Sequence, residues 1–179
     1  MTEPRDLEPV TGAHGAEALS SVAVAEWLLF AAPDTSQALQ DWRLTGTTVL
    51  PCGDSFSAVR IPAAVVQAAA NRREPAAIAE RLVDALLGGP VVVSTDGTSY
   101  FALTPSAGPV RQLPAGIEYL GQSALLMVPR PDLTDPRLHG HASYWAVPML
   151  EPGNLCQLDA ALQLAAVGRH RHLTKGTEQ

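Results

Sequence analysis

Short β-prone runs separated by glycine and proline turns fill the chain from residue 89 to 148, and this pattern limits the possible folds most strongly. The runs lie at residues 91–94, 100–104, 117–120, 124–128 and 144–147. Asp96-Gly97 between the first two predicts a hairpin turn, which joins antiparallel neighbours. The block is therefore expected to form a mainly antiparallel sheet.

Helical patterns surround this block. They are expected at residues 16–32, from 34 or 36 to 42, at 62–71, 75–87 and 155–167, with Gly168 as the final stop. Ile78, Leu82 and Leu86 recur at i, i+4 and i+8 and predict a buried stripe. Two further runs, 47–50 and 56–61, enclose a Gly-Asp turn and predict a second hairpin. The fold class expected is α+β, with helices packed on the sheet.

The length of 179 residues suits a single domain, which we expect at residues 16–168 between flexible polar tails at 1–15 and 169–179. No apolar run reaches the ~18 residues of a membrane span. Four acids among the first twenty residues argue against a secretory signal. Cys52 and Cys156 form no CxxC motif, which is typical of reduced thiols. These features predict a cytoplasmic protein that does not bind membranes.

The charge and the motifs exclude several functional classes. Eighteen acidic residues against twelve basic ones give a net charge of −6, which repels a phosphate backbone and argues against binding of duplex DNA. The glycine-rich strings of dinucleotide and P-loop proteins are absent, as are the HExxH and GxSxG motifs. We therefore expect no cofactor.

Some local features allow two interpretations each. His139 and His141 could share a metal, but further ligands are not evident and a solvated loop is favoured. Cys52 could be a reactive thiol, although a small half-buried residue is the default. The Arg72-Arg73 pair could bind phosphate, but at a helix end it more often offsets the helix dipole. Trp145 lies beside Tyr144 on a strand, which leaves open whether one ring is exposed.

Four stretches occur in an order that resembles a known domain. They are DWRLTGTTVLPCGDSFSAVRIP at 41–62, GPVVVSTDGTSYFALTP at 89–105, GIEYLGQSALLMVPRP at 116–131 and SYWAVP at 143–148. This order resembles the N-terminal prim-pol domain of bacterial bifunctional DNA primase/polymerases, within the archaeo-eukaryotic primase superfamily. The resemblance covers about 105 residues, mostly through glycine, proline and apolar positions.

The resemblance implies a degenerate member of that family. Two-metal phosphoryl transfer needs an Asp-x-Asp pair, and the corresponding positions here are Arg60 and Pro62. The histidine of the second motif falls on Thr98 or Ser99, and Glu118 alone keeps an acid. An arginine repels a divalent ion, so we expect no metal and no nucleotide polymerisation. We expect Arg60 and Glu118 to face one cleft from adjacent strands.

The favoured function is a non-catalytic primase-like domain whose cleft binds a protein partner or a small ligand. Its candidate pocket residues are Arg60, Ser99, Glu118, His139, His141 and Tyr144. A small hydrolase or transferase is an alternative, with chemistry relocated to Glu118, Ser99, Cys52 and the histidine loop. A second alternative is a single-strand nucleic-acid module that stacks bases on Trp145 and Tyr144. The sequence leaves the oligomeric state open.

Overall fold

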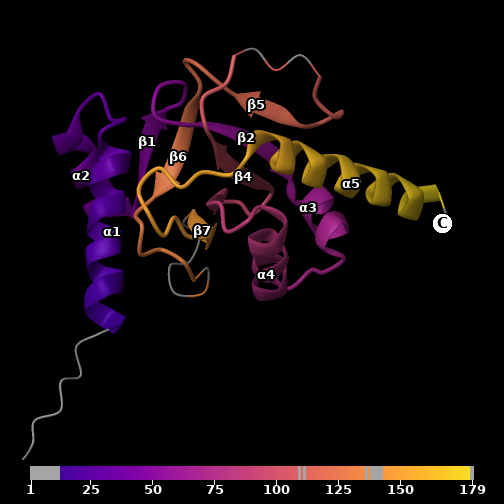
Figure 1. Ribbon diagram of the computed structural model, residues 1–179, viewed down its shortest axis with the longest axis horizontal. Coiled ribbons are helices and arrows are strands. Elements are labelled where there is room, and N and C mark those ends of the chain that lie inside the picture. Colours follow the sequence, from indigo (N-terminus) through magenta and orange to yellow (C-terminus); the bar gives the residue numbers. More distant parts are fainter. Residues whose placement is uncertain (1–12, 109, 111, 136, 138–142, 178–179) are drawn as a thin grey trace, which may run out of the picture.

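The computed structural model describes residues 13–108, 110, 112–135, 137 and 143–177, and it has an α+β fold (Figure 1). In chain order the elements are α1 (Ala13–Leu29), α2 (Thr35–Thr45), β1 (Thr47–Pro51), β2 (Ser57–Pro62), α3 (Ala63–Ala70), α4 (Pro75–Ala85), β3 (Val91–Val93), β4 (Ser99–Thr104), β5 (Glu118–Leu120), β6 (Leu125–Pro129), β7 (Tyr144–Val147) and α5 (Leu158–Thr177). The predicted helices and strands are present in the predicted order. Asp34 caps α2, as its position before the helix indicates, by accepting a hydrogen bond from the Gln37 amide.

The strands form two antiparallel sheets. Five of them pair in the order β5-β2-β4-β3-β7, and β1 pairs with β6 in a separate two-stranded ribbon. The predicted Asp96-Gly97 hairpin joins β3 to β4. The hairpin predicted from 47–50 and 56–61 is wrong, because β1 and β2 belong to different sheets.

The residues after β1 explain this difference. The Cys52 amide donates to the Ala124 carbonyl, and the Gly53 amide donates to the Phe56 carbonyl. Gly53 has a φ of +119°, and a Cβ atom there would lie 2.6 Å from the Cα atom of Gln122. The Gly-Asp segment therefore packs against the turn before β6 and carries the chain from one sheet to the other.

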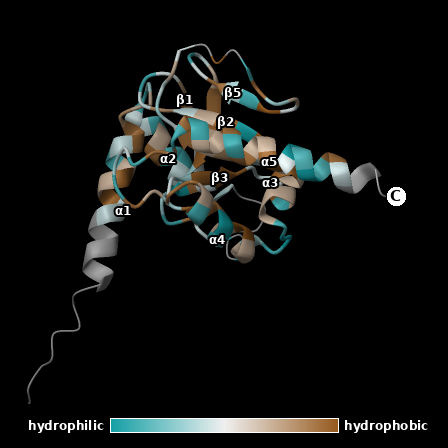
Figure 2. Ribbon diagram, turned by 45° about the vertical axis from the view of Figure 1, so that its right-hand side comes forward, coloured by the Kyte–Doolittle hydropathy of each residue, from teal (hydrophilic) through white to brown (hydrophobic). Residues whose placement is uncertain are grey.

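The five-stranded sheet separates two hydrophobic cores. On one face, Val59 and Ile61 pack with α3, α4 and α5, and on the other face Ala58 and Leu103 pack with the ribbon and the first two helices. Figure 2 shows the hydrophobic strand β3 at the centre of the molecule. The apolar stripe predicted for α4 is confirmed by the buried Ile78, Leu82 and Leu86. No helix in the described part of the chain has the length and apolarity needed to cross a membrane.

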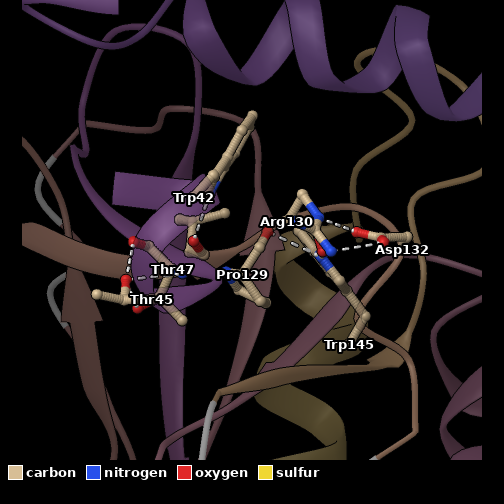
Figure 3. Close-up of polar contacts among 8 residues, drawn as sticks. Trp42, Thr45, Thr47, Pro129, Arg130, Asp132 and Trp145 are labelled. Carbon is tan, nitrogen blue, oxygen red and sulfur yellow. Dashed lines mark hydrogen bonds and ion pairs between the residues drawn. The ribbon is translucent and has the colours of Figure 1, made fainter. Parts of the chain in front are cut away.

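Two tryptophans bind the end of β6 from opposite sides (Figure 3). Trp42 of α2 donates its indole N–H to the Val128 carbonyl at 3.1 Å. Trp145 of β7 donates to the carbonyls of Pro129 at 3.1 Å and Arg130 at 3.2 Å. Both rings are buried, Trp145 with 1% of its surface exposed. These bonds supply donors to carbonyls in the segment that leads out of the ribbon.

The last helix continues past its predicted stop. We expected α5 to end at Gly168, but it runs to Thr177, so residues 169–177 are helical. Gly168 lies where α5 crosses α3, and a Cβ atom there would lie 2.3 Å from the Val65 carbonyl oxygen. The glycine allows the two helices to approach closely instead of ending the second one. The predicted tail at 1–15 lies mostly outside the described residues.

This crossing predicts the effect of Gly168→Ala. Alanine is favoured over glycine in a helix interior by about 1 kcal/mol. Here its methyl group would overlap Val65, and we expect the free energy of unfolding to fall by about 1–3 kcal/mol. Urea denaturation followed by circular dichroism measures this change. Val167→Ala, at the exposed neighbouring position, is the control and should change the value by less than about 0.5 kcal/mol. A Gly168→Ala protein as stable as the parent would contradict the close crossing.

Candidate functional site

Three of the predicted site residues meet on the ribbon side of the five-stranded sheet. Arg60 of β2 lies directly opposite Glu118 of β5, and its Nη1 atom is 2.9 Å from the Glu118 Oε1 atom. The Arg60 Nε–H also donates to the Ser99 Oγ atom of β4 at 3.1 Å. Cross-strand neighbours point to one side of a sheet, which brings these side chains together. Their placement agrees with the predicted positions of Arg60 and Glu118 on adjacent strands.

The cluster is an open ion pair over a buried hydroxyl. The side chains of Arg60 and Glu118 are 40% and 61% exposed, whereas Ser99 is buried. Exposed pairs of this kind contribute about 0.2–1 kcal/mol to stability, so the cluster is not needed to hold the strands together. Within the residues that the structure describes, no group of three or more His, Cys, Asp or Glu side chains could hold a metal ion. The cluster presents one cation and one carboxylate to a partner.

A groove lies beside this cluster, and we call it the ribbon groove. It is a cavity of about 380 Å³ between the ribbon and the β3–β4 turn. Its lining residues are Ser94, Thr95, Asp96, Phe101, Leu125, Leu126, Met127 and Ser143. Phe101 is also the β4 neighbour of Arg60, so one row of side chains leads from Glu118 through Arg60 to the groove. The Thr95 hydroxyl donates to the Met127 sulfur at 3.5 Å across it.

The outer side of the ribbon is apolar. Val49 of β1 and Met127 of β6 face each other across the ribbon and are 48% and 46% exposed, and Leu125 is 65% exposed. Strand periodicity turns Leu126 and Val128 inward, where they are buried. We call Val49, Leu125 and Met127 the ribbon face. Sequence reasoning missed it because the run from Leu125 to Pro129 has no polar residue to mark an outer side.

Asp96 is ionised at the rim of the ribbon groove. Its carboxylate accepts hydrogen bonds from the Ser94 hydroxyl at 2.5 Å, the Thr98 amide at 3.0 Å and the Thr98 hydroxyl at 2.8 Å. These bonds, the one from Ser94 first, lower the pKa of Asp96 to about 2. Asp96 therefore puts an ionised carboxylate at the groove, and Arg60 lies between its register neighbours Glu118 and Phe101.

Tyr144 does not join this cluster. It lines a different cavity of about 380 Å³ together with α4 residues and Arg137. Tyr144 and Tyr100 both pair with Val93 in the sheet register. The cross-strand row that contains Arg60 runs through Phe101 and Val92 and ends at Trp145, the neighbour of Tyr144. Adjacent strand residues point to opposite faces, so Tyr144 lies on the helix side of the sheet and not with Arg60. Burial, with a smaller contribution from Tyr144, raises the pKa of Tyr100 to about 12.

The remaining candidates that the structure describes do not assemble a catalytic pair. Burial raises the pKa of Cys52 to about 11, so its thiol is protonated at neutral pH. The side chain was predicted to be half-buried, but it is fully buried. Trp145 is buried by the contacts described above and presents no stacking surface. Ser99 accepts a hydrogen bond from Arg60, which cannot act as a base. His139 and His141 lie outside the described residues.

The environment of Asp96 predicts its pH dependence. Because its pKa in the folded chain lies below the ordinary value of 3.8, the turn bonds stabilise the fold fully above that value and are lost as the pH falls towards about 2. Carboxyl-detected NMR titration should give a midpoint well below 3.8 for Asp96. Thr98→Val removes one donor and should raise that midpoint. A midpoint at the ordinary value in both proteins would contradict the hydrogen-bonded turn.

Comparisons with known proteins leave the family open. The chain matches no protein-family model, no curated protein and no solved structure. The resemblance to prim-pol domains therefore stays a prediction from the order of the segments. The principal features of the chain are therefore Arg60 with its two partners, the ribbon groove and the ribbon face.

Proposed function

We propose that this chain is a non-catalytic primase-like domain that binds a protein partner at the ribbon groove. The observation that carries the proposal is the engagement of Arg60 with Glu118 and Ser99. The resemblance to prim-pol domains implies a metal-binding acid at the position of Arg60. An arginine at this position does not support metal-dependent chemistry, because its charge repels a divalent ion. Its Nε and one Nη donate to Ser99 and Glu118, and its other N–H donors can bind a partner.

The ribbon face supports a protein as the partner. Leu125, Met127 and Val49 are large apolar side chains that stay nearly half exposed or more on two neighbouring strands. Exposed apolar patches next to polar rims are typical of protein contacts. Methionine adapts its shape to different surfaces. The Asp96 carboxylate, which lines the groove together with Leu125 and Met127, favours a partner surface with an apolar centre and a basic residue at its edge.

The two alternatives have less support. An enzyme with relocated chemistry would need a nucleophile beside a base, and the burial of Cys52 and the Arg60–Ser99 bond argue against the candidates named for it. A single-strand nucleic-acid module would need exposed rings, and the buried Trp145 removes one of the two proposed for stacking. The net charge of −6 also favours a protein over nucleic acid as the partner.

The absence of polymerase chemistry is directly testable. We expect the purified chain to incorporate no dNTP or NTP, with or without a template, in the presence of magnesium or manganese. The physical reason is that one carboxylate, Glu118, cannot hold two divalent ions. Radiolabelled nucleotide incorporation measures this activity. Incorporation that Glu118→Gln abolishes would overturn the non-catalytic assignment.

The binding surface is tested by site-specific crosslinking. A photoreactive benzoylphenylalanine in place of Met127 should form one discrete protein adduct in cells of the source organism, because this side chain lies in the proposed interface. The same group in place of Val83 is the control, because Val83 of α4 is 43% exposed but lies on the other side of the sheet.

The partner identified from the adduct must then bind the purified unmodified chain. We expect Leu125→Asp to weaken that binding at least tenfold, because it puts a charge into the apolar patch. Isothermal titration calorimetry measures the affinity. Equal crosslinking from positions 83 and 127, or unchanged affinity of Leu125→Asp, would contradict the ribbon groove as the binding surface.

A further inference from the structure

Two neighbouring cavities on the helix side of the molecule are lined by arginines. One, of about 440 Å³, is lined by Arg72, Arg73 and His172 together with neutral residues of α3. The other, of about 690 Å³, is lined by Arg72, Arg81 and Arg171, with Thr174 and further residues of α3. Asn71 and Arg72 line both, so the cavities adjoin. We call Arg72, Arg73, Arg81 and Arg171 the arginine site.

The arginine site concentrates positive charge on an acidic chain. It holds four of the twelve lysine and arginine residues, although acids outnumber bases by eighteen to twelve. Neither cavity is lined by a carboxylate from the described residues. The described ion pairs of the chain involve Arg60, Arg130 and Arg137, and none involves the arginine site. Asp84 lines a third cavity next to Arg81, but the two cavities themselves combine four arginines with no lining carboxylate among the described residues, which gives a positive local potential.

Compensation of the α3 dipole accounts for only part of this charge. The Arg171 Nη1 atom donates to the Ala69 carbonyl at 2.7 Å, and the Arg72 Nη1 atom donates to the Asn71 carbonyl at 3.0 Å. These bonds cover carbonyls at the end of α3. Each guanidinium has five N–H donors, so both arginines keep donors for a ligand. Arg73 and Arg81 donate no hydrogen bond to any of the described residues.

The fold brings these residues together from distant parts of the chain. Arg72 and Arg73 follow α3, Arg81 lies on α4, and Arg171 lies on the part of α5 beyond the Gly168 crossing. Figure 2 shows hydrophilic residues along this outer part of α5. If α5 ended at Gly168, Arg171 and His172 could not reach α3. The close crossing therefore completes the two cavities.

We propose that the arginine site binds a small molecule that carries two or more phosphate groups. Guanidinium groups bind phosphate through paired N–H bonds, which favours phosphate over a single carboxylate. Two adjoining cavities that share Arg72 suit two linked phosphates, one in each. Volumes of about 440 and 690 Å³ lie in the range of small-molecule sites. Both cavities are also lined by alanines of α3, such as Ala68 and Ala69, whose small side chains leave room for a ligand.

A small ligand fits better than a nucleic acid. A long phosphate backbone would extend beyond the arginine site over a chain with net charge −6 and would be repelled there. A compact polyphosphate places its whole charge within the two cavities. The inference goes beyond the proposed function and does not depend on it, because the arginine site and the ribbon groove lie on opposite sides of the five-stranded sheet.

Sodium tripolyphosphate is the probe for this site. We expect isothermal titration calorimetry at 0.15 M salt to detect its binding, with orthophosphate at least tenfold weaker because it reaches one cavity only. Arg72→Gln should weaken tripolyphosphate binding at least tenfold, and adding Arg81→Gln should abolish it. Both side chains are exposed, so the variants are expected to fold, and circular dichroism checks this. Arg43→Gln, at an exposed arginine of α2, is the matched control and should bind like the parent.

Several outcomes would overturn the proposal. They are no binding of tripolyphosphate, unchanged affinity of Arg72→Gln, or an equal loss with Arg43→Gln, which would indicate general surface charge. A single-stranded oligonucleotide whose affinity exceeds that of tripolyphosphate and rises with length would assign the arginine site to nucleic acid instead. Crosslinking at position 127 is unaffected by any of these results, so the two proposals fail separately.

Discussion

The indole bonds of Trp42 and Trp145 hold the ribbon in place, and the proposed binding surface depends on them. The ribbon of β1 and β6 forms a sheet of its own, without ladder pairing to the five-stranded sheet among the described strands. Its position therefore rests on side-chain packing and on the bonds to the carbonyls of Val128, Pro129 and Arg130. Buried carbonyls need donors, and these two rings supply them from α2 and from β7. A ribbon held in this way keeps its inner residues in the core and its apolar outer face in solvent.

The register of the five-stranded sheet decides which candidate residues act together. Arg60, Glu118 and Phe101 share one row and one face, whereas Tyr144 belongs to the row of Tyr100 on the other face. The sheet thus separates the Arg60–Glu118 pair and the ribbon face from the arginine site on the helix side. This separation is what allows the two proposed sites, one for a protein partner and one for a compact phosphate anion, to act independently.

Local signals in the sequence predicted the parts of the fold that depend on near neighbours. The α4 stripe, the Asp34 cap and the Asp96-Gly97 hairpin follow from spacing and turn chemistry within a few residues. The alignment of segments also placed Arg60 and Glu118 on adjacent strands. The second hairpin was predicted wrongly because two β-prone runs around a Gly-Asp turn do not indicate which strands they pair with. The partner of β2 is β4, more than 35 residues further along the chain, and the partner of β1 is β6, more than 70 residues further along.

Gly168 shows the division between sequence and tertiary structure most clearly. By itself the sequence determined the α+β class, the order of its elements and the lack of paired acids at Arg60 and Pro62, because these depend on residue type and local periodicity. Only the tertiary structure decided that Gly168 is a helix crossing and not a stop, and that Arg171 consequently reaches α3. The physical reason is that a glycine permits both a left-handed turn and a close approach, and only the neighbouring backbone selects between them.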